Sequence, residues 1–247
     1  MQDFTPTPIE EPLQFGARQP VLRLDRISRI FHQGEREIRV LDEASADFWP
    51  GEAVALVGPS GAGKSTLLHI TGLLETPSGG HVMVDGRDCS ALDDNERTAV
   101  RRNEMGFVYQ FHQLLPEFSA LENVAMPMLI QGRPKAEANA RAKELLEVLG
   151  LGARLDHRPA RLSGGEQQRT AICRALASEP KLLLADEPTG NLDPETSEHV
   201  FSGLLDLVTS TGVAALIATH NFDLAKRMHR ILRLDRGKLV EIPRTAL

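Results

Sequence analysis

The sequence predicts an α/β fold with a mostly parallel sheet core, an N-terminal antiparallel β subdomain and an inserted α-helical subdomain. Continuous apolar runs such as AVALVG, KLLLADE and AALIATH alternate with helical segments, which is typical of buried parallel strands joined by helices. A mostly helical stretch at about 112–163 separates two of these strands. We therefore expect one domain over residues 21–242 that contains the helical subdomain.

Local patterns predict the elements in order. Residues 21–31 read as a strand, and EIRVLDEASADFWPGE after them predicts two or three short strands joined by turns. Further strands are expected at 53–58, HVMVDG, 106–110, KLLLADE and AALIATH. Helices are expected from Lys64 to about Gly72 and over 93–102, 119–149 (interrupted at QGRP), 164–178 and 195–211. A short helix and a hairpin around Asp235-Arg236-Gly237 follow.

Composition excludes several broad classes of protein. The 247 residues are 41% hydrophobic and 25% charged, which is ordinary for a globular protein. The net charge of −6 offers no general basic surface for nucleic acid. No apolar run approaches the roughly 18 residues that span a bilayer, so we expect no membrane-spanning segment.

The termini and the cysteines suggest no chemistry of their own. Residues 1–20 lack a basic start and an apolar run, so we expect a disordered tail there and not a secretory signal, with a short tail at 243–247. Cys89 and Cys173 lack metal-ligand spacing. We expect both thiols to be small apolar fillers in a reducing compartment.

A glycine-rich motif follows the strand AVALVG. GPSGAGKST satisfies GxxxxGK[ST] between a strand and a helix, so the chain is predicted to be a P-loop NTPase. The glycines let backbone amides wrap the phosphates, Lys64 reaches the β- and γ-phosphates, and the Ser65 hydroxyl can bind Mg²⁺. The predicted nucleotide contacts are Gly58, Pro59, Ser60, Gly61, Ala62, Gly63, Lys64, Ser65 and Thr66.

Polar residues end three other predicted strands at the same sheet edge. Asp186 and Glu187 close KLLLADE, where adjacent side chains point to opposite faces, so they should have different roles. Asp186 suits Mg²⁺, and Glu187 could polarise an attacking water. Gln110 and His220 close the other two strands. A lone histidine is more often structural, but this convergence favours a contact of His220 with the γ-phosphate or water.

The segment LSGGEQQR poses a separate question. Ser163 and Glu166 fit a capping box, in which each side chain binds the backbone N–H of the other. The box needs no glycine, and each glycine inside a helix costs roughly 1 kcal/mol relative to alanine. Gly164 and Gly165 therefore indicate that something else requires bare backbone here.

These motifs together resemble one family. GPSGAGKST, YQ, LSGGE, LLLADEPTGNLD and ATH, in this order over roughly 21–242, look like an ATP-binding cassette (ABC) ATPase. The resemblance implies a RecA-like core and an ATPase that forms a head-to-tail homodimer with two ATP at its interface. Ser163, Gly164 and Gly165, with Glu166, would complete the partner's nucleotide site. By the same likeness Lys64, Gln110, Glu187 and His220 are catalytic, Asp193 binds nucleotide, and Ser65, Gln110 and Asp186 hold Mg²⁺.

Two positions depart from the family's pattern. The family usually stacks adenine on a tyrosine shortly before the second strand, and Phe31 occupies that place, which keeps the ring and loses the hydroxyl. The family commonly has His-Asp at the switch, whereas this chain has His220-Asn221. A role for an aspartate at that position does not carry over.

The segment 109–130 favours one branch of the family. Its loop is too apolar for a purely solvated connection, with Phe111, Leu114, Leu115, Phe118 and Leu121. With HRPARLSGGE and THNFDLAKRMHR, it resembles the ATPase subunits of lipoprotein-releasing systems (the LolD type). That likeness implies LolC/LolE-like permease subunits docking near Gln110–Asn123. It also implies a peripheral position on the cytoplasmic face of the inner membrane.

Other functions remain as alternatives. Macrolide-efflux and cell-division cassettes share much of this pattern. Cassettes that act on nucleic acid or ribosomes usually carry two cassettes or a long coiled-coil insertion, whereas this chain has one Lys64 motif and one LSGGE. A soluble P-loop kinase would leave LSGGE and His220 unexplained.

Overall fold

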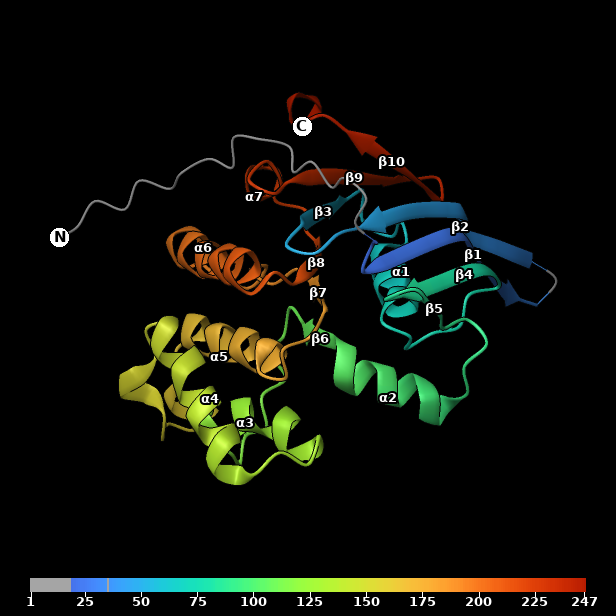
Figure 1. Cartoon of the computed structure of the whole chain (residues 1–247). Coiled ribbons are helices and arrows are strands. Elements are labelled where there is room, and N and C mark those ends of the chain that lie inside the picture. Colours follow the sequence, from blue (N-terminus) through green and yellow to red (C-terminus); the bar gives the residue numbers. More distant parts are fainter. Residues whose placement is uncertain (1–18, 35) are drawn as a thin grey trace.

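The computed structural model describes residues 19–34 and 36–247 (Figure 1). The expected N-terminal tail covers residues 1–20, and its residues 1–18 lie outside the described residues. The chain forms a 6-stranded sheet of order β10-β9-β3-β8-β7-β6 and a 4-stranded sheet of order β2-β1-β4-β5. Helices α3 and α4 lie away from the N-terminal sheet, at the far side of α5 (Figure 1).

The 6-stranded sheet is the predicted parallel core. Its members are β3 (Ala53–Val57), β6 (Met105–Val108), β7 (Leu182–Asp186), β8 (Ala214–Ala218), β9 (Arg230–Asp235) and β10 (Lys238–Ile242). All neighbours pair in parallel except β9 and β10, which form the predicted hairpin. All five residues of β3 and of β8 are buried, as expected for strands covered on both faces.

The 4-stranded sheet is antiparallel, with β1 (Leu22–Gln33), β2 (Arg36–Phe48), β4 (Gly79–Val84) and β5 (Arg87–Asp88). The prediction of two or three short strands after residue 31 was wrong, because β2 is one strand of 13 residues. Irregularities occur within the β1–β2 pair as register shifts, and Arg26 and Glu43 adopt positive φ. Bulges of this kind bend a strand without ending its pairing.

The helices match the predicted positions closely. They are α1 (Lys64–Thr71), α2 (Asp94–Glu104), α3 (Ala120–Ile130), α4 (Lys135–Val148), α5 (Gly164–Leu176), α6 (Pro194–Thr211) and α7 (Phe222–Ala225). Short 3-10 turns lie at η1 (Gly152–Arg154), η2 (Pro159–Arg161) and η3 (Arg244–Ala246). Each of α2, α3 and α5 begins with a capping box. None of the helices in residues 19–34 and 36–247 is long and apolar enough to cross a bilayer.

The core divides into two clusters on the two faces of the 6-stranded sheet. In β3, Ala53 and Ala55 belong to one cluster, while Val54 and Leu56 belong to the other. The first cluster extends into α3, α4, α5 and α6, so α5 joins the inserted helices to the sheet. Cys173 lies in that cluster and Cys89 in the other, and both thiols are free and buried, as predicted.

Candidate nucleotide site and its surroundings

The P-loop connects β3 to α1, and its glycines have specific reasons to be there. Gly61 and Gly63 adopt φ of 77° and 103°, a region that favours glycine. A Cβ atom on Gly63 would lie 2.6 Å from Cγ1 of Val40, on β2. The Lys64 ammonium lies across the loop and donates to the carbonyl oxygens of Gly58 at 2.9 Å and Pro59 at 3.1 Å.

Ser65 and Asp186 meet beside the P-loop. The Ser65 hydroxyl donates to Oδ2 of Asp186 at 2.9 Å, although the residues are far apart in sequence. Asp186 is the last residue of β7, and Ser65 lies in the first turn of α1. In residues 19–34 and 36–247, no cluster of three or more His, Cys, Asp or Glu side chains could hold a metal. This pair instead suits an ion that takes its other ligands from phosphates and water, as Mg²⁺ does.

Glu187 and His220 form a second pair at the same edge. His220 Nδ1 lies 2.9 Å from Oε2 of Glu187, and the side chains are 70% and 16% exposed, respectively. Glu187 lies beyond the end of β7 with φ of 46°, and its N–H donates to the carbonyl of Ala218. The turn therefore directs its carboxylate, where we expected strand pleating to do so. Asp186 and Glu187 do contact different partners.

Gln110 follows β6 and is held near Glu187 by a loop that we did not single out. Its Nε2 donates to Oδ1 of Asn191 at 3.2 Å, and Asn191 Nδ2 donates to the Gln110 carbonyl at 3.1 Å. A Cβ atom on Gly190 would lie 3.1 Å from Gln110 Nε2 and 3.3 Å from Cβ of Glu187. The glycine lets these side chains approach. The sequence signal that could have identified this loop is the segment PTGNLD, which contains Gly190 and Asn191.

The start of α5 contains the predicted capping box. Ser163 Oγ accepts from the Glu166 N–H at 3.3 Å, and Glu166 Oε2 accepts from the Ser163 N–H at 2.8 Å. Arg154 Nε also donates to Oε1 of Glu166 at 2.8 Å. These bonds, chiefly the one from the Ser163 N–H, lower the pKa of Glu166. Its carboxylate is engaged within the subunit, although we predicted that it helps to bind the partner's nucleotide.

The two glycines of this motif differ. Gly165 is buried, and a Cβ atom there would lie closer than 3.0 Å to Cγ2 of Thr196 on α6. Gly164 is exposed, and a Cβ atom there would make an ordinary contact of 3.5 Å with Leu192. Packing inside the chain therefore explains why position 165 requires glycine, but it does not explain the glycine at position 164.

Asp193 and Phe31 are placed by local contacts. Asp193 caps α6, and its Oδ1 accepts from the Thr196 N–H at 3.0 Å. Phe31 is 37% exposed, pairs with Ile38 across the β1–β2 hairpin and carries the Arg29 guanidinium 4.4 Å from its ring centre. Ile38 is two residues from Val40, which contacts the P-loop. The aromatic ring thus lies on the strand pair that flanks the phosphate cradle.

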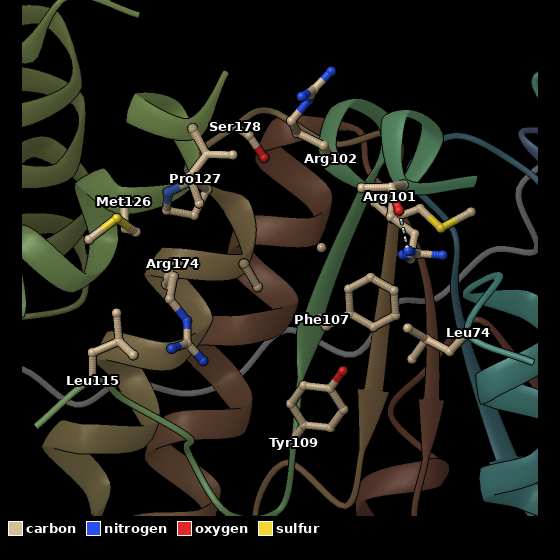
Figure 2. A pocket seen from close by; sticks show the side chains of 15 residues that line it. Leu74, Arg101, Arg102, Phe107, Tyr109, Leu115, Met126, Pro127, Arg174 and Ser178 are labelled. Atoms are coloured by element: carbon tan, nitrogen blue, oxygen red, sulfur yellow. Dashed lines mark hydrogen bonds between the residues drawn. The ribbon is translucent and has the colours of Figure 1, made fainter. Parts of the chain in front are cut away.

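An apolar groove of about 480 Å³ lies between α2, β6, α3 and α5 (Figure 2). Its lining includes the apolar side chains of Leu74, Phe107, Leu115, Met126 and Ile130 and the guanidinium groups of Arg101, Arg102 and Arg174. The predicted permease dock at Gln110–Asn123 contributes Leu115 to it, and Phe111 nearby is 71% exposed. Most of the lining comes from outside the segment that the sequence assigned to the dock.

Polar side chains of α3 and α5 hold the loop that lies beside the groove. Asn123 is fully buried, and its Nδ2 donates to the carbonyls of Leu115, Phe118 and Ser119. Two side chains of α5 hold the preceding segment. Gln168 Nε2 donates to the Tyr109 carbonyl at 3.2 Å, and Arg174 donates to the carbonyls of His112 and Gln113 at 2.9 and 2.6 Å.

The chain is similar to several proteins of one kind. It is 61% identical to "Lipoprotein-releasing system ATP-binding protein LolD 1" of Rhodospirillum rubrum, with 90% of this chain and 98% of that protein aligned. It is 60% identical to the LolD protein of Paramagnetospirillum magneticum, over 90% and 98% of the two chains. For LolD 2 of Caulobacter vibrioides the identity is 59%, over 89% and 96%.

A solved structure has the same fold. It is the dimeric, post-hydrolysis state of the ATP-binding cassette MJ0796 bound to ADP and Pi, with a TM-score of 0.82 and 37% identity. The alignment covers 90% of this chain and 98% of that one. Residues 41–190 match the family model described as ABC transporter. The chain therefore belongs to the ABC transporter family, and its described residues include the ATPase domain of such a transporter.

Proposed function

We propose that the chain is the ATP-hydrolysing subunit of an inner-membrane ABC transporter that releases lipoproteins toward a periplasmic carrier. The observation that carries ATP hydrolysis is the convergence of Lys64, Ser65, Asp186, Glu187 and His220 at one sheet edge. Identities of 59–61% to proteins named for lipoprotein release favour that transport function over efflux or cell division. The proposed ATPase domain spans residues 21–242.

The P-loop and its neighbours would bind the nucleotide. Backbone amides of 58–66 would wrap the β- and γ-phosphates, while Lys64 exchanges its carbonyl contacts for phosphate oxygens. Ser65 and Asp186 fit the ligand set of Mg²⁺, with Gln110 close by. Mg²⁺ would neutralise charge on the phosphates. Phe31 would stack on the adenine ring from the N-terminal sheet.

Glu187 would orient and deprotonate the attacking water, because the turn after β7 holds its backbone at this sheet edge through the bond to the Ala218 carbonyl. His220 contacts that carboxylate at 2.9 Å and is the proposed contact to the γ-phosphate. Gln110, held by Asn191, would complete the catalytic set beside Glu187. In-line attack on the γ-phosphate requires this positioning and electrostatic stabilisation.

The second half of each site would come from another copy of the chain. Ser163, Gly164 and Gly165 lie at the start of α5, where backbone N–H groups and the helix dipole favour an anion. Two dimeric structures of MJ0796 support the pairing of two copies of a similar chain. In a head-to-tail homodimer, Ser163–Gly165 would bind the partner's γ-phosphate, and Asp193 would lie near the same interface.

The apolar groove and the loop at Gln110–Asn123 are the proposed dock for LolC/LolE-like permease subunits. The groove is lined mainly by apolar side chains, with Arg101, Arg102 and Arg174 among them, so a short amphipathic helix with acidic side chains would complement it (Figure 2). Because the loop follows Gln110 directly, a partner seated there would be linked to the catalytic site. With such a dock, the subunit would lie peripherally on the cytoplasmic face of the inner membrane.

Co-purification and reconstitution test the proposal. The tagged chain, purified from membranes in mild detergent, should bring down a permease with a large periplasmic domain. In proteoliposomes the complex should release a lipoprotein only with ATP, Mg²⁺ and a periplasmic carrier protein. The matched control is the complex that carries Lys64→Ala. Drug efflux or association with a cell-division permease would overturn lipoprotein release and leave the ATPase assignment intact.

A further inference from the structure

The start of α5 packs closely against the start of α6 at Gly165 and Thr196. A Cβ atom on Gly165 would lie closer than 3.0 Å to Cγ2 of Thr196. Its next neighbours are Arg169 Nη1 at 3.8 Å and Thr196 Cβ at 3.9 Å, which are ordinary contacts. The Thr196 methyl group alone therefore fills the space that a side chain at Gly165 would need.

Thr196 is held in place from the other side. Asp193 caps α6 and accepts from the Thr196 N–H at 3.0 Å. Hydrogen bonds from the Thr196 hydroxyl and N–H to this carboxylate lower the pKa of Asp193. Turning the side chain to relieve a clash would break the hydroxyl contact, and β-branched side chains have few rotamers in a helix. The position of the methyl group is therefore fixed, and it limits how closely α5 can approach α6 at this point.

Gly164 provides the contrast within the same turn. A Cβ atom there would contact Leu192 Cδ2 at 3.5 Å, which is ordinary van der Waals distance. The position is also exposed, so alanine fits inside the subunit. The two glycines therefore separate two requirements, a free approach for a ligand at Gly164 and close packing at Gly165.

We propose that Thr196 is a positioning residue for ATP hydrolysis, because its methyl group sets how the start of α5 sits against the start of α6. The two helix starts carry Ser163 with Gly164 and Asp193, which the proposed function brings to the partner's nucleotide. Through Gly165 and Thr196 they form one rigid piece, so both motifs approach the second copy in a fixed relative position. The inference rests on that proposed function.

A compensating pair of substitutions tests this directly. Gly165→Ala adds the clashing Cβ atom, and Thr196→Ser removes Cγ2 while keeping the hydroxyl that contacts Asp193. In the hydrolysis-slow Glu187→Gln background, Gly165→Ala should weaken ATP-dependent dimerisation at least about tenfold. The double variant Gly165→Ala/Thr196→Ser should regain most of it. Gly165→Ala/Thr196→Val keeps a methyl group at the contact and should not recover.

Dimerisation would be measured by analytical ultracentrifugation at several ATP concentrations, with thermal unfolding of each variant alongside. A loss in Gly165→Ala that Thr196→Ser does not restore, in folded protein, would show that the substitution acts independently of the Thr196 methyl group and would overturn the proposal. Full dimerisation of Gly165→Ala would also overturn it. A role in folding alone would lower the Tm of Gly165→Ala and leave ATP-dependent dimerisation of the folded fraction unchanged.

Failure of the proposed function looks different. In that case the Glu187→Gln chain with native Gly165 and Thr196 would not dimerise with ATP at all. The packing contact could then still be followed through the Tm, which should fall in Gly165→Ala, recover with Thr196→Ser and stay unchanged in Gly164→Ala.

Discussion

The P-loop edge and the start of α5 both offer backbone amides to phosphate, but they are built differently. At the P-loop edge, Ser65 contacts Asp186 and Glu187 contacts His220, and Lys64 lies beside the first pair on the P-loop. At the start of α5, Ser163 and Glu166 satisfy each other and Arg154. Under the proposed function, the first region would supply a cation, a metal ligand and a base, whereas the second would supply amides and a hydroxyl. The first region would then be a catalytic half-site and the second a completing half-site.

The largest expected effect is at the base of the catalytic half-site. Glu187→Gln removes the carboxylate that would accept the proton of water, and should lower kcat by about 10²–10⁴-fold. ATP should still bind, so the variant should accumulate as an ATP-bound dimer, measured by phosphate release and gel filtration. Asp206→Asn, on the exposed face of α6, removes one carboxylate elsewhere and should keep normal turnover. Normal turnover in Glu187→Gln would contradict the assignment.

A smaller effect is expected where α5 links the two regions. Gln168 is buried, its Nε2 donates to the Tyr109 carbonyl, and its Oε1 lies 2.7 Å from His112 Nδ1. Gln168→Leu leaves those groups without partners and should lower the free energy of unfolding by about 1–3 kcal/mol, measured by urea denaturation. Gln131→Leu removes one bond to the Arg102 carbonyl at a less buried position and should cost less. Equal losses of unfolding free energy in the two variants would show that the hydrogen bonds of Gln168 stabilise the fold no more than the single bond of Gln131.

The smallest effect is a pH dependence of stability. His229 Nδ1 accepts from the N–H of Ala53, at the start of the P-loop strand, and burial with help from Arg244 lowers the pKa of His229. The folded state therefore favours neutral histidine. Its contribution is fully present above the ordinary histidine pKa of about 6.5 and is lost as the pH falls from there through the lowered folded pKa.

Urea midpoints between pH 8 and pH 5 measure this dependence. His229→Asn should remove part of the acid loss, whereas His199→Gln, on an exposed face of α6, should keep it. An unchanged pH profile in His229→Asn would show that this histidine does not titrate with folding.

The sequence predicted that these strand-end side chains meet at one sheet edge, because short-range patterns determine their positions. An apolar strand followed by GPSGAGKST places Lys64, and the ends of parallel strands converge on one edge whatever the loops do. The direction of Glu187 was harder, since it depends on a residue with positive φ just past the strand. Asn191 and Gly190 lie in the motif PTGNLD, but only the folded loop shows that Asn191 binds Gln110 and that Gly190 leaves room for it.

Long-range packing was out of reach of sequence patterns. The reason for Gly165 lies at Thr196, on another helix, and no local periodicity links the two. The groove likewise draws its side chains from α2, β6, α3 and α5, so only Leu115 fell within the predicted dock. The sequence predicted two or three short strands where the structure has the single strand β2. The irregular residues that suggested turns form bulges within a continuous pairing.

A mixing experiment tests the central claim, that each site is shared between two chains. Lys64→Ala damages the catalytic half-site, Ser163→Arg blocks the completing half-site, and each variant alone should be inactive. A hybrid dimer has one site with both defects and one site with neither. Mixing tagged chains should therefore restore a measurable fraction of ATPase activity. No recovery, although pull-down proves that hybrid dimers form, would contradict shared sites.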